Sequence, residues 1–143
     1  MNIPAHCFVQ KGHPGTRLVC AEEGRRVVFH KAKGQLADKI RVDGCCLPAG
    51  QEACDFLVID WKHRFHFVEL KGRGVEKALA QILATIPWFV RKGVRDQFWC
   101  LVASSGTSPK ARPGIQAKER ILARNWPGSV LKIRTNQCDH HLA

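Results

Sequence analysis

The 143-residue sequence lacks several features that would assign it to a familiar class. It has no tyrosine, a single methionine and no C-x-x-C pair. Its first residues contain no apolar segment of the kind that a signal peptide requires. No apolar run approaches the roughly 18 residues of a membrane-spanning helix. These absences predict a protein that is neither exported nor inserted into a membrane, and we expect a cytoplasmic location.

Acidic residues are scarce as well. Lys and Arg number 23 against 12 Asp and Glu, which gives a formal net charge of +11. Hydrophobic residues make up 45% of the chain, a proportion typical of a globular domain rather than a disordered one. Such a surplus of positive charge favours a polyanionic partner, with nucleic acid first and an anionic membrane surface second. The plain alternative is that the charge serves solubility.

The cysteines are odd in number, at positions 7, 20, 45, 46, 54, 100 and 138. Without an export signal, this count predicts a reduced chain with free thiols. Cys54 and Cys100 lie within apolar runs and are expected to be small buried hydrophobic residues. The spacing of the potential zinc ligands matches no common pattern; these are Cys45, Cys46, Cys54 and Cys138, with His140 and His141.

The alternation of apolar runs and turn residues predicts a mixed α/β fold in one domain, residues 1–143. Residues 1–17 are expected to be an irregular lead-in, and a core is expected over residues 26–134. Strands are predicted over residues 26–30, 39–42, 54–60, 65–71, 97–103 and 130–134, with a loop over 104–112. A first helix is predicted from Val75 to Val90, where apolar residues recur at helical spacing, with a kink or an end near Pro87. A second helix is predicted from Pro113 to about Asn125. The expected architecture is a mixed central sheet flanked by helices.

Three charged residues stand at one end of the predicted hairpin formed by residues 54–60 and 65–71. If Trp61 lies opposite Phe65, then Asp55 lies opposite Lys71 and diagonal to Glu69, with all three on one face of the sheet. Carboxylates gathered in this way suit a hard divalent cation, which lowers the pKa of a bound water and screens phosphoryl charge. A buried salt bridge between Lys71 and one of the two carboxylates is the alternative.

Asp55, thirteen intervening residues and then Glu69-Leu70-Lys71 resemble the PD-(D/E)xK nuclease superfamily, which has the restriction-endonuclease-like fold. In that family the Asp lies on the second strand of a meander and the Glu-x-Lys on the third. A supporting Gln often follows on the next helix, where this chain has Gln81. The likeness covers roughly residues 39–104, about half of the chain.

The resemblance implies a metal-dependent endonuclease in which a metal-activated water attacks a phosphodiester, with Mg²⁺ or Mn²⁺ as cofactor. Asp55 and Glu69 would be metal ligands, and Leu70 would contribute its carbonyl. Lys71 would be the catalytic lysine and Gln81 a secondary catalytic residue, unless Gln81 is merely a solvated helix residue. Family members often cut as dimers, so a homodimer is one expected assembly.

The sequence departs from the family pattern at several points. Cys54 replaces the Pro before the Asp, and Thr85 stands where one subgroup has Tyr. The family's first helix often supplies another Glu; Glu22 and Glu23 are the candidates here, but strands replace that helix. The fourth acidic position is therefore unassigned.

Basic residues gather late in the chain. From Arg91 onward, ten Lys and Arg residues stand against three acidic ones. We expect the DNA-binding residues to be Lys110, Arg112, Lys118, Arg120 and Arg124, which would contact backbone phosphates; the alternative is a solvated basic helix face. The rival to a nuclease is a non-catalytic module on the same fold that binds nucleic acid or protein, for example a phage or mobile-element antagonist.

Overall fold

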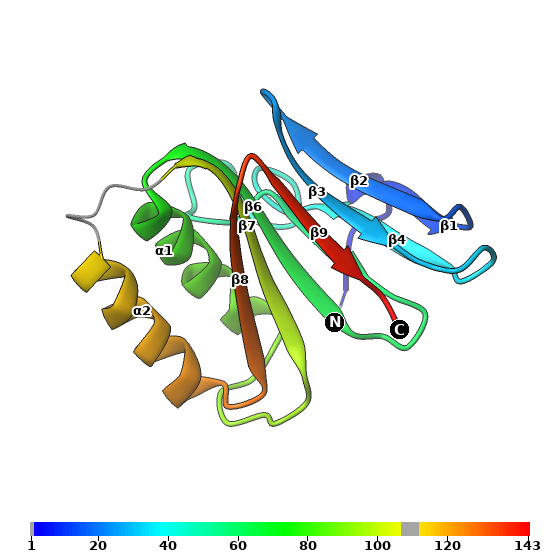
Figure 1. The fold of residues 1–143 in the computed structure, drawn as a ribbon. Helices are drawn as coiled ribbons and strands as arrows, with labels where there is room; N and C mark the ends of the chain where they lie inside the picture. Colours follow the sequence, from blue (N-terminus) through cyan, green and yellow to red (C-terminus); the bar gives the residue numbers. More distant parts are fainter. Residues whose placement is uncertain (1, 107–111) are drawn as a thin grey trace.

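The computed structural model describes residues 2–106 and 112–143 and has a mixed α/β fold in three layers (Figure 1). The strands are β1 (Phe8–His13), β2 (Arg17–Glu22), β3 (Arg25–His30), β4 (Ala37–Arg41), β5 (Phe56–Ile59), β6 (Phe65–Arg73), β7 (Phe98–Gly106), β8 (Ser129–Thr135) and β9 (Gln137–His141). The helices are α1 (Val75–Thr85) and α2 (Arg112–Asn125), with short 3-10 turns at Ala5–Cys7 and Ile86–Trp88.

The central layer is a mixed six-stranded sheet in the order β1-β4-β5-β6-β7-β8. Strands β4, β5 and β6 form an antiparallel meander, whereas β7 and β8 run parallel to β6. Parallel neighbours require crossover connections, which α1 and α2 provide. Both helices lie on one side of this sheet, and the smaller sheet β2-β3-β9 covers the other (Figure 1). Because both faces are covered, β5, β6 and β7 are almost continuously apolar.

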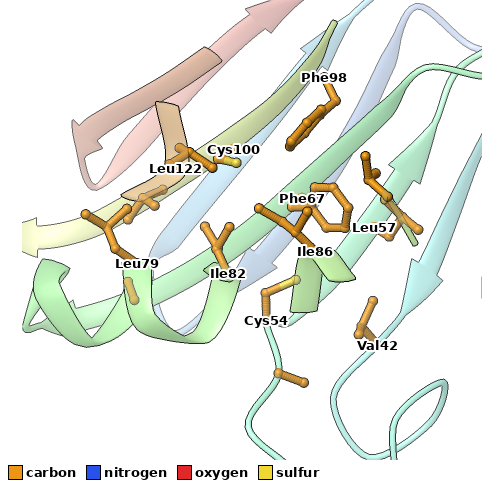
Figure 2. Close-up of a cluster of buried hydrophobic side chains, with 14 of the residues drawn as sticks. Val42, Cys54, Leu57, Phe67, Leu79, Ile82, Ile86, Phe98, Cys100 and Leu122 are labelled. Carbon is orange, nitrogen blue, oxygen red and sulfur yellow. The ribbon is translucent and has the colours of Figure 1, made fainter. Parts of the chain in front are cut away.

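Two hydrophobic cores hold the three layers together. On the helix side, Phe67 and Cys100 of the sheet meet Leu79 and Ile82 of α1 and Leu122 of α2 (Figure 2). Cys100 is fully buried there, as predicted, and so is Cys54. The second core lies between the sheets and joins side chains of β2, β3 and β9 to β5, β6 and β7. Each fully buried Leu, Ile or Phe contributes about 1.5–3 kcal/mol.

The predicted strands of the meander and the crossovers are present with boundaries shifted by a few residues. Helix α1 ends at Thr85, earlier than predicted, and Pro87 lies in the 3-10 turn that follows. Strand β7 extends to Gly106, so the predicted loop over 104–112 begins later. Its residues 107–111 lie outside the described residues.

The expectation of an irregular lead-in over residues 1–17 is wrong, because β1 occupies part of it. Gly12 adopts φ 64°, and the pairing of β1 with β4 shifts register on either side of Gln10, so a segment with turn residues still forms an edge strand. The smaller sheet was not predicted either. Its strand β2 buries only Leu18 and Cys20, and such short half-buried strands give little signal.

The prediction that all cysteines are free is wrong for two of them. Cys7 and Cys45 form a disulfide that joins the turn before β1 to the segment after β4. The pairing of Phe8 with Ile40 brings these distant positions together. The other five cysteines are free thiols.

Candidate active site

A hollow of about 480 Å³ lies where β6 ends and β5 begins. It is lined by the predicted site residues Asp55, Glu69, Leu70, Lys71 and Gln81, together with Glu22, Glu23, Arg25, Asp43, Gly72 and Arg73. Larger hollows exist elsewhere on the described surface, including one of about 590 Å³ beside Leu36 and Trp61. What distinguishes this hollow is therefore its lining and not its size.

The register of the hairpin differs from the prediction by two residues. Ile59 pairs with Phe65 and Phe56 with Val68, so the next position along sets Asp55 opposite Glu69 and not opposite Lys71. A shift of two keeps every side chain on its predicted face. The cause is Asp60, which was assigned to the strand but caps the turn: its carboxylate accepts the backbone N–H of Lys62 and of Arg64, each at 2.9 Å.

Asp55 and Glu69 are locked together by reciprocal hydrogen bonds. The backbone N–H of Asp55 donates to Glu69 Oε1 at 3.0 Å, and the N–H of Leu70 donates to Asp55 Oδ2 at 2.9 Å. Each carboxylate thus accepts a hydrogen bond from the backbone of the neighbouring segment and is held in place, unlike an acidic side chain that extends freely into solvent. The two carboxyl groups are the kind of oxygen donors that Mg²⁺ and Mn²⁺ prefer.

Glu69 is buried, with 2% of its surface exposed. Burial, a side-chain hydrogen bond with Asp55 and the charge of Asp55 together raise the pKa of its carboxyl from 4.5 to about 9, with burial as the largest cause. Without a cation, Glu69 therefore carries its proton at neutral pH. The positive charge of a divalent cation between the two carboxyl groups would offset that shift and favour the ionised carboxylate, so the donor set fits the predicted metal.

Lys71 follows Glu69 by two residues on the same face of β6 and lines the same hollow. Among the described residues, no carboxylate lies within 4.0 Å of its ammonium group, so the predicted alternative of a salt bridge is not formed. Leu70 also borders the hollow, but its side chain packs between the two sheets. What Leu70 can offer to a ligand is therefore its backbone.

Gln81 projects from α1 into the hollow and is only partly exposed, so it is not a freely solvated residue. Its Oε1 atom is buried and has no hydrogen-bond partner in the described part of the chain. One turn further on, the hydroxyl of Thr85 donates to the Gln81 carbonyl at 2.7 Å and accepts the Cys54 N–H at 2.8 Å. Thr85 thus ties α1 to the segment that carries Asp55, a positioning role that was not predicted.

Further acidic groups reach the hollow from elements that were not assigned to the site. Asp43 follows β4, Glu22 ends β2, and Glu23 lies in the turn between β2 and β3. Glu22 and Glu23, which were predicted as candidates for a further acidic residue, thus reach the hollow from the smaller sheet. Asp43 carried no sequence signal, because only the fold brings β4 beside β5.

Two arginines complete the rim. Arg25 is largely enclosed, donating to Glu23 Oε2 at 3.2 Å and to Ser105 Oγ at 3.3 Å. Arg73 is exposed, at the end of β6. Five carboxyl groups thus face three cationic side chains, Arg25, Lys71 and Arg73, in a chain that is strongly positive elsewhere. The hollow therefore attracts a cation, although the protein as a whole attracts polyanions.

The predicted DNA-binding residues of α2 do not converge on this hollow, since none of them lines it. Arg112, Arg120 and Arg124 are all exposed; Arg120 and Arg124 lie one turn apart, and Arg112 is rotated from Arg124 by about 120° around the helix axis. Lys118 lies one turn after the buried Ile115, on the packed side instead. Lys110 lies outside the described residues.

Helix α2 runs away from the hollow. Its first turn lies beside the first turn of α1, where Gly114 contacts the Glu76 side chain, and its last residue, Asn125, accepts the Gly93 N–H before β7 starts. Arg124 therefore lies about 18 Å along the helix axis from Arg112. Among these arginines, Arg112 is the one at the same end of the sheet as the hollow.

No family model, curated protein or solved structure matches this chain. Among the described helices, neither has the length and apolar character to cross a membrane.

Proposed function

We propose that the protein is a metal-dependent endonuclease that hydrolyses phosphodiester bonds of DNA, of the PD-(D/E)xK type. The observation that carries the proposal is the locked pair of Asp55 and Glu69 beside an ammonium group without an ion-pair partner in one hollow. In a structural salt bridge the ammonium group of Lys71 would pair with a carboxylate, whereas the ammonium group of a catalytic lysine has to be free to contact the substrate.

The connectivity around the hollow supports the proposal. The meander β4-β5-β6, the helix α1 and the parallel strand β7 follow the order of the restriction-endonuclease-like core. Asp55 precedes the second strand of this meander, and Glu69 and Lys71 lie on the third. The first helix of that core is replaced by strands.

Asp55 and Glu69 would hold Mg²⁺ or Mn²⁺, with the Leu70 carbonyl as a further oxygen donor. The bound cation would polarise a phosphoryl oxygen and make water a stronger nucleophile. Lys71 would stabilise negative charge that develops on the phosphate, and Gln81, with its unpartnered Oε1, would orient the attacking water. The surplus positive charge would hold the DNA, with Arg112 nearest to the site.

A Lys71→Ala variant tests the proposal. Both carboxyl groups remain, so we expect the fold, cation binding and DNA affinity to persist. Plasmid nicking should fall at least ~100-fold, the scale of losing one transition-state contact. Lys77→Ala on the exposed face of α1 removes the same charge outside the hollow and should nick like the parent. A folded Lys71→Ala protein that nicks as fast as the parent would end this role for the lysine.

The second candidate is a module that binds nucleic acid or protein without cutting. The α2 arginines favour it, because they are exposed and cationic and do not converge on the hollow. A parent that binds DNA yet never nicks duplex, single-stranded or branched DNA with either metal would make this candidate the preferred one. A cytoplasmic location and a homodimer stay predictions.

A further inference from the structure

A second cluster of metal-ligating side chains lies outside the hollow. One ligand atom each from His6, Cys7 and Cys45 lies within 4.8 Å of the other two. None of the three residues lines the hollow with Asp55 and Glu69. Here the sulfurs of Cys7 and Cys45 are joined as a disulfide.

The backbone on both sides of this cluster is held in place. Cys7 closes the 3-10 turn with its N–H donated to the Pro4 carbonyl at 3.0 Å. The Cys45 N–H donates to the Val42 carbonyl at 3.1 Å, and the pairing of β1 with β4 fixes the two segments side by side. The two sulfurs will therefore remain close when the bond between them is broken.

We propose that the reduced protein binds a zinc-type divalent ion through the thiolates of Cys7 and Cys45 and the imidazole of His6. Sulfur and imidazole nitrogen are the ligands that Zn²⁺ prefers, in contrast to the oxygen donors of the hollow. A dithiol reductant supplies two electrons to the disulfide and becomes a cyclic disulfide itself, leaving two thiols. The ion then replaces the two thiol protons, which are released to solvent.

Charge and composition favour this assignment. The disulfide is uncharged, and in the reduced protein two thiolates balance the charge of a divalent ion. The buried Cys7 side chain is therefore not left beside an unpaired charge in either state. A disulfide does not require a neighbouring histidine. The imidazole nitrogen of the exposed His6 nevertheless lies within 4.8 Å of both sulfurs. Three protein ligands leave the fourth position of the ion to water.

The neighbouring thiol is not part of the cluster. Cys46 follows Cys45 directly, but its sulfhydryl donates to the Arg41 carbonyl at 3.3 Å. The remaining free thiols, Cys20, Cys54, Cys100 and Cys138, are buried in the two cores. Cys46→Ser is therefore the matched control for Cys45→Ser, one residue away.

Cobalt titration tests the proposal. The full chain is reduced with a phosphine, which ends as its oxide, and is then titrated with Co²⁺ without oxygen. We expect thiolate-to-cobalt charge-transfer absorption that saturates at one ion per chain and disappears when Zn²⁺ is added. The same chain with the disulfide intact should show none. This comparison requires no substitution and so cannot fail through misfolding; equal absorption in the two states, or none in either, would overturn the proposal.

The variants then identify the ligands. Cys45→Ser should lose the charge-transfer band, and His6→Ala should bind at least ~10-fold more weakly, since even groups that only support a ligand cost about 10–100-fold when lost. Cys46→Ser should retain parental binding, as should Glu69→Gln, which alters only the hollow. Loss of the band in either control would contradict the three-ligand assignment.

Discussion

Replacing Thr85 by valine should detach α1 from the segment that carries Asp55. The Thr85 side chain is fully buried, and its hydroxyl joins the Cys54 N–H to the Gln81 carbonyl. Valine preserves the shape but leaves the Cys54 N–H without a partner, which costs about 1–3 kcal/mol. For a chain of this size, about 1 kcal/mol lowers Tm by about 3–4 °C, so we expect a decrease of about 3–12 °C.

The freed segment should also hold Asp55 less firmly against Glu69. We therefore expect the rise in Tm on adding Mn²⁺ to be smaller in Thr85→Val than in the parent, measured by thermal melts with EDTA and with metal. Thr85→Ser retains the hydroxyl and loses only a methyl group, about 1 kcal/mol, so its metal response should be parental. The reasoning is refuted if valine is as stable as threonine, or if serine and not valine loses the metal response.

Asp55→Ala should abolish the thermal stabilisation by Mg²⁺ or Mn²⁺ that the parent shows, and equal parental melting temperatures with EDTA and with metal would count against the site. In the folded, metal-free protein the pKa of Glu69 is raised to about 9. Its protonated carboxyl therefore contributes its full stabilisation below the ordinary pKa of 4.5, and this contribution is lost as pH rises through about 9. Urea melts over that range should show a decline that Glu69→Gln lessens; parallel profiles would contradict the shift. DNA affinity should fall steeply with salt, and charge reversal at Lys110 and Arg112 should weaken it alike across unrelated sequences; salt-independent anisotropy titrations would favour a protein partner.

Among the elements predicted from the sequence, the most deeply buried ones give the clearest signal. β5, β6, α1 and β7 carry long apolar runs or a helical stripe, because layers on either side exclude water from them. The face shared by Asp55, Glu69 and Lys71 followed from the two-residue period of a strand, and it survived the error in register. That error came from Asp60, whose role as a turn cap depends on side-chain hydrogen bonds.

The remaining features depend on contacts between distant parts of the chain. Asp43 and Arg25 enter the hollow because two different sheets end there, and no local pattern marks them, whereas Glu22 was a candidate only through the family resemblance. The Cys7–Cys45 disulfide likewise depends on the pairing of an irregular edge strand with β4. Strand β9 is mostly polar and lacks the apolar alternation that would predict it, and the apolar run of β2 is short.

The nicking of DNA by the parent and by Glu69→Gln, assayed together with Mg²⁺ or Mn²⁺, tests the central claim most directly. Glutamine resembles the protonated side chain that Glu69 has without a cation, so the variant should fold and, at neutral pH, melt no lower than the metal-free parent. We predict that the parent converts supercoiled plasmid to nicked circles only when metal is present, and that Glu69→Gln does not. Equal nicking by the two proteins, or nicking by the parent that persists in EDTA, would contradict a metal-dependent nuclease centred on Asp55 and Glu69.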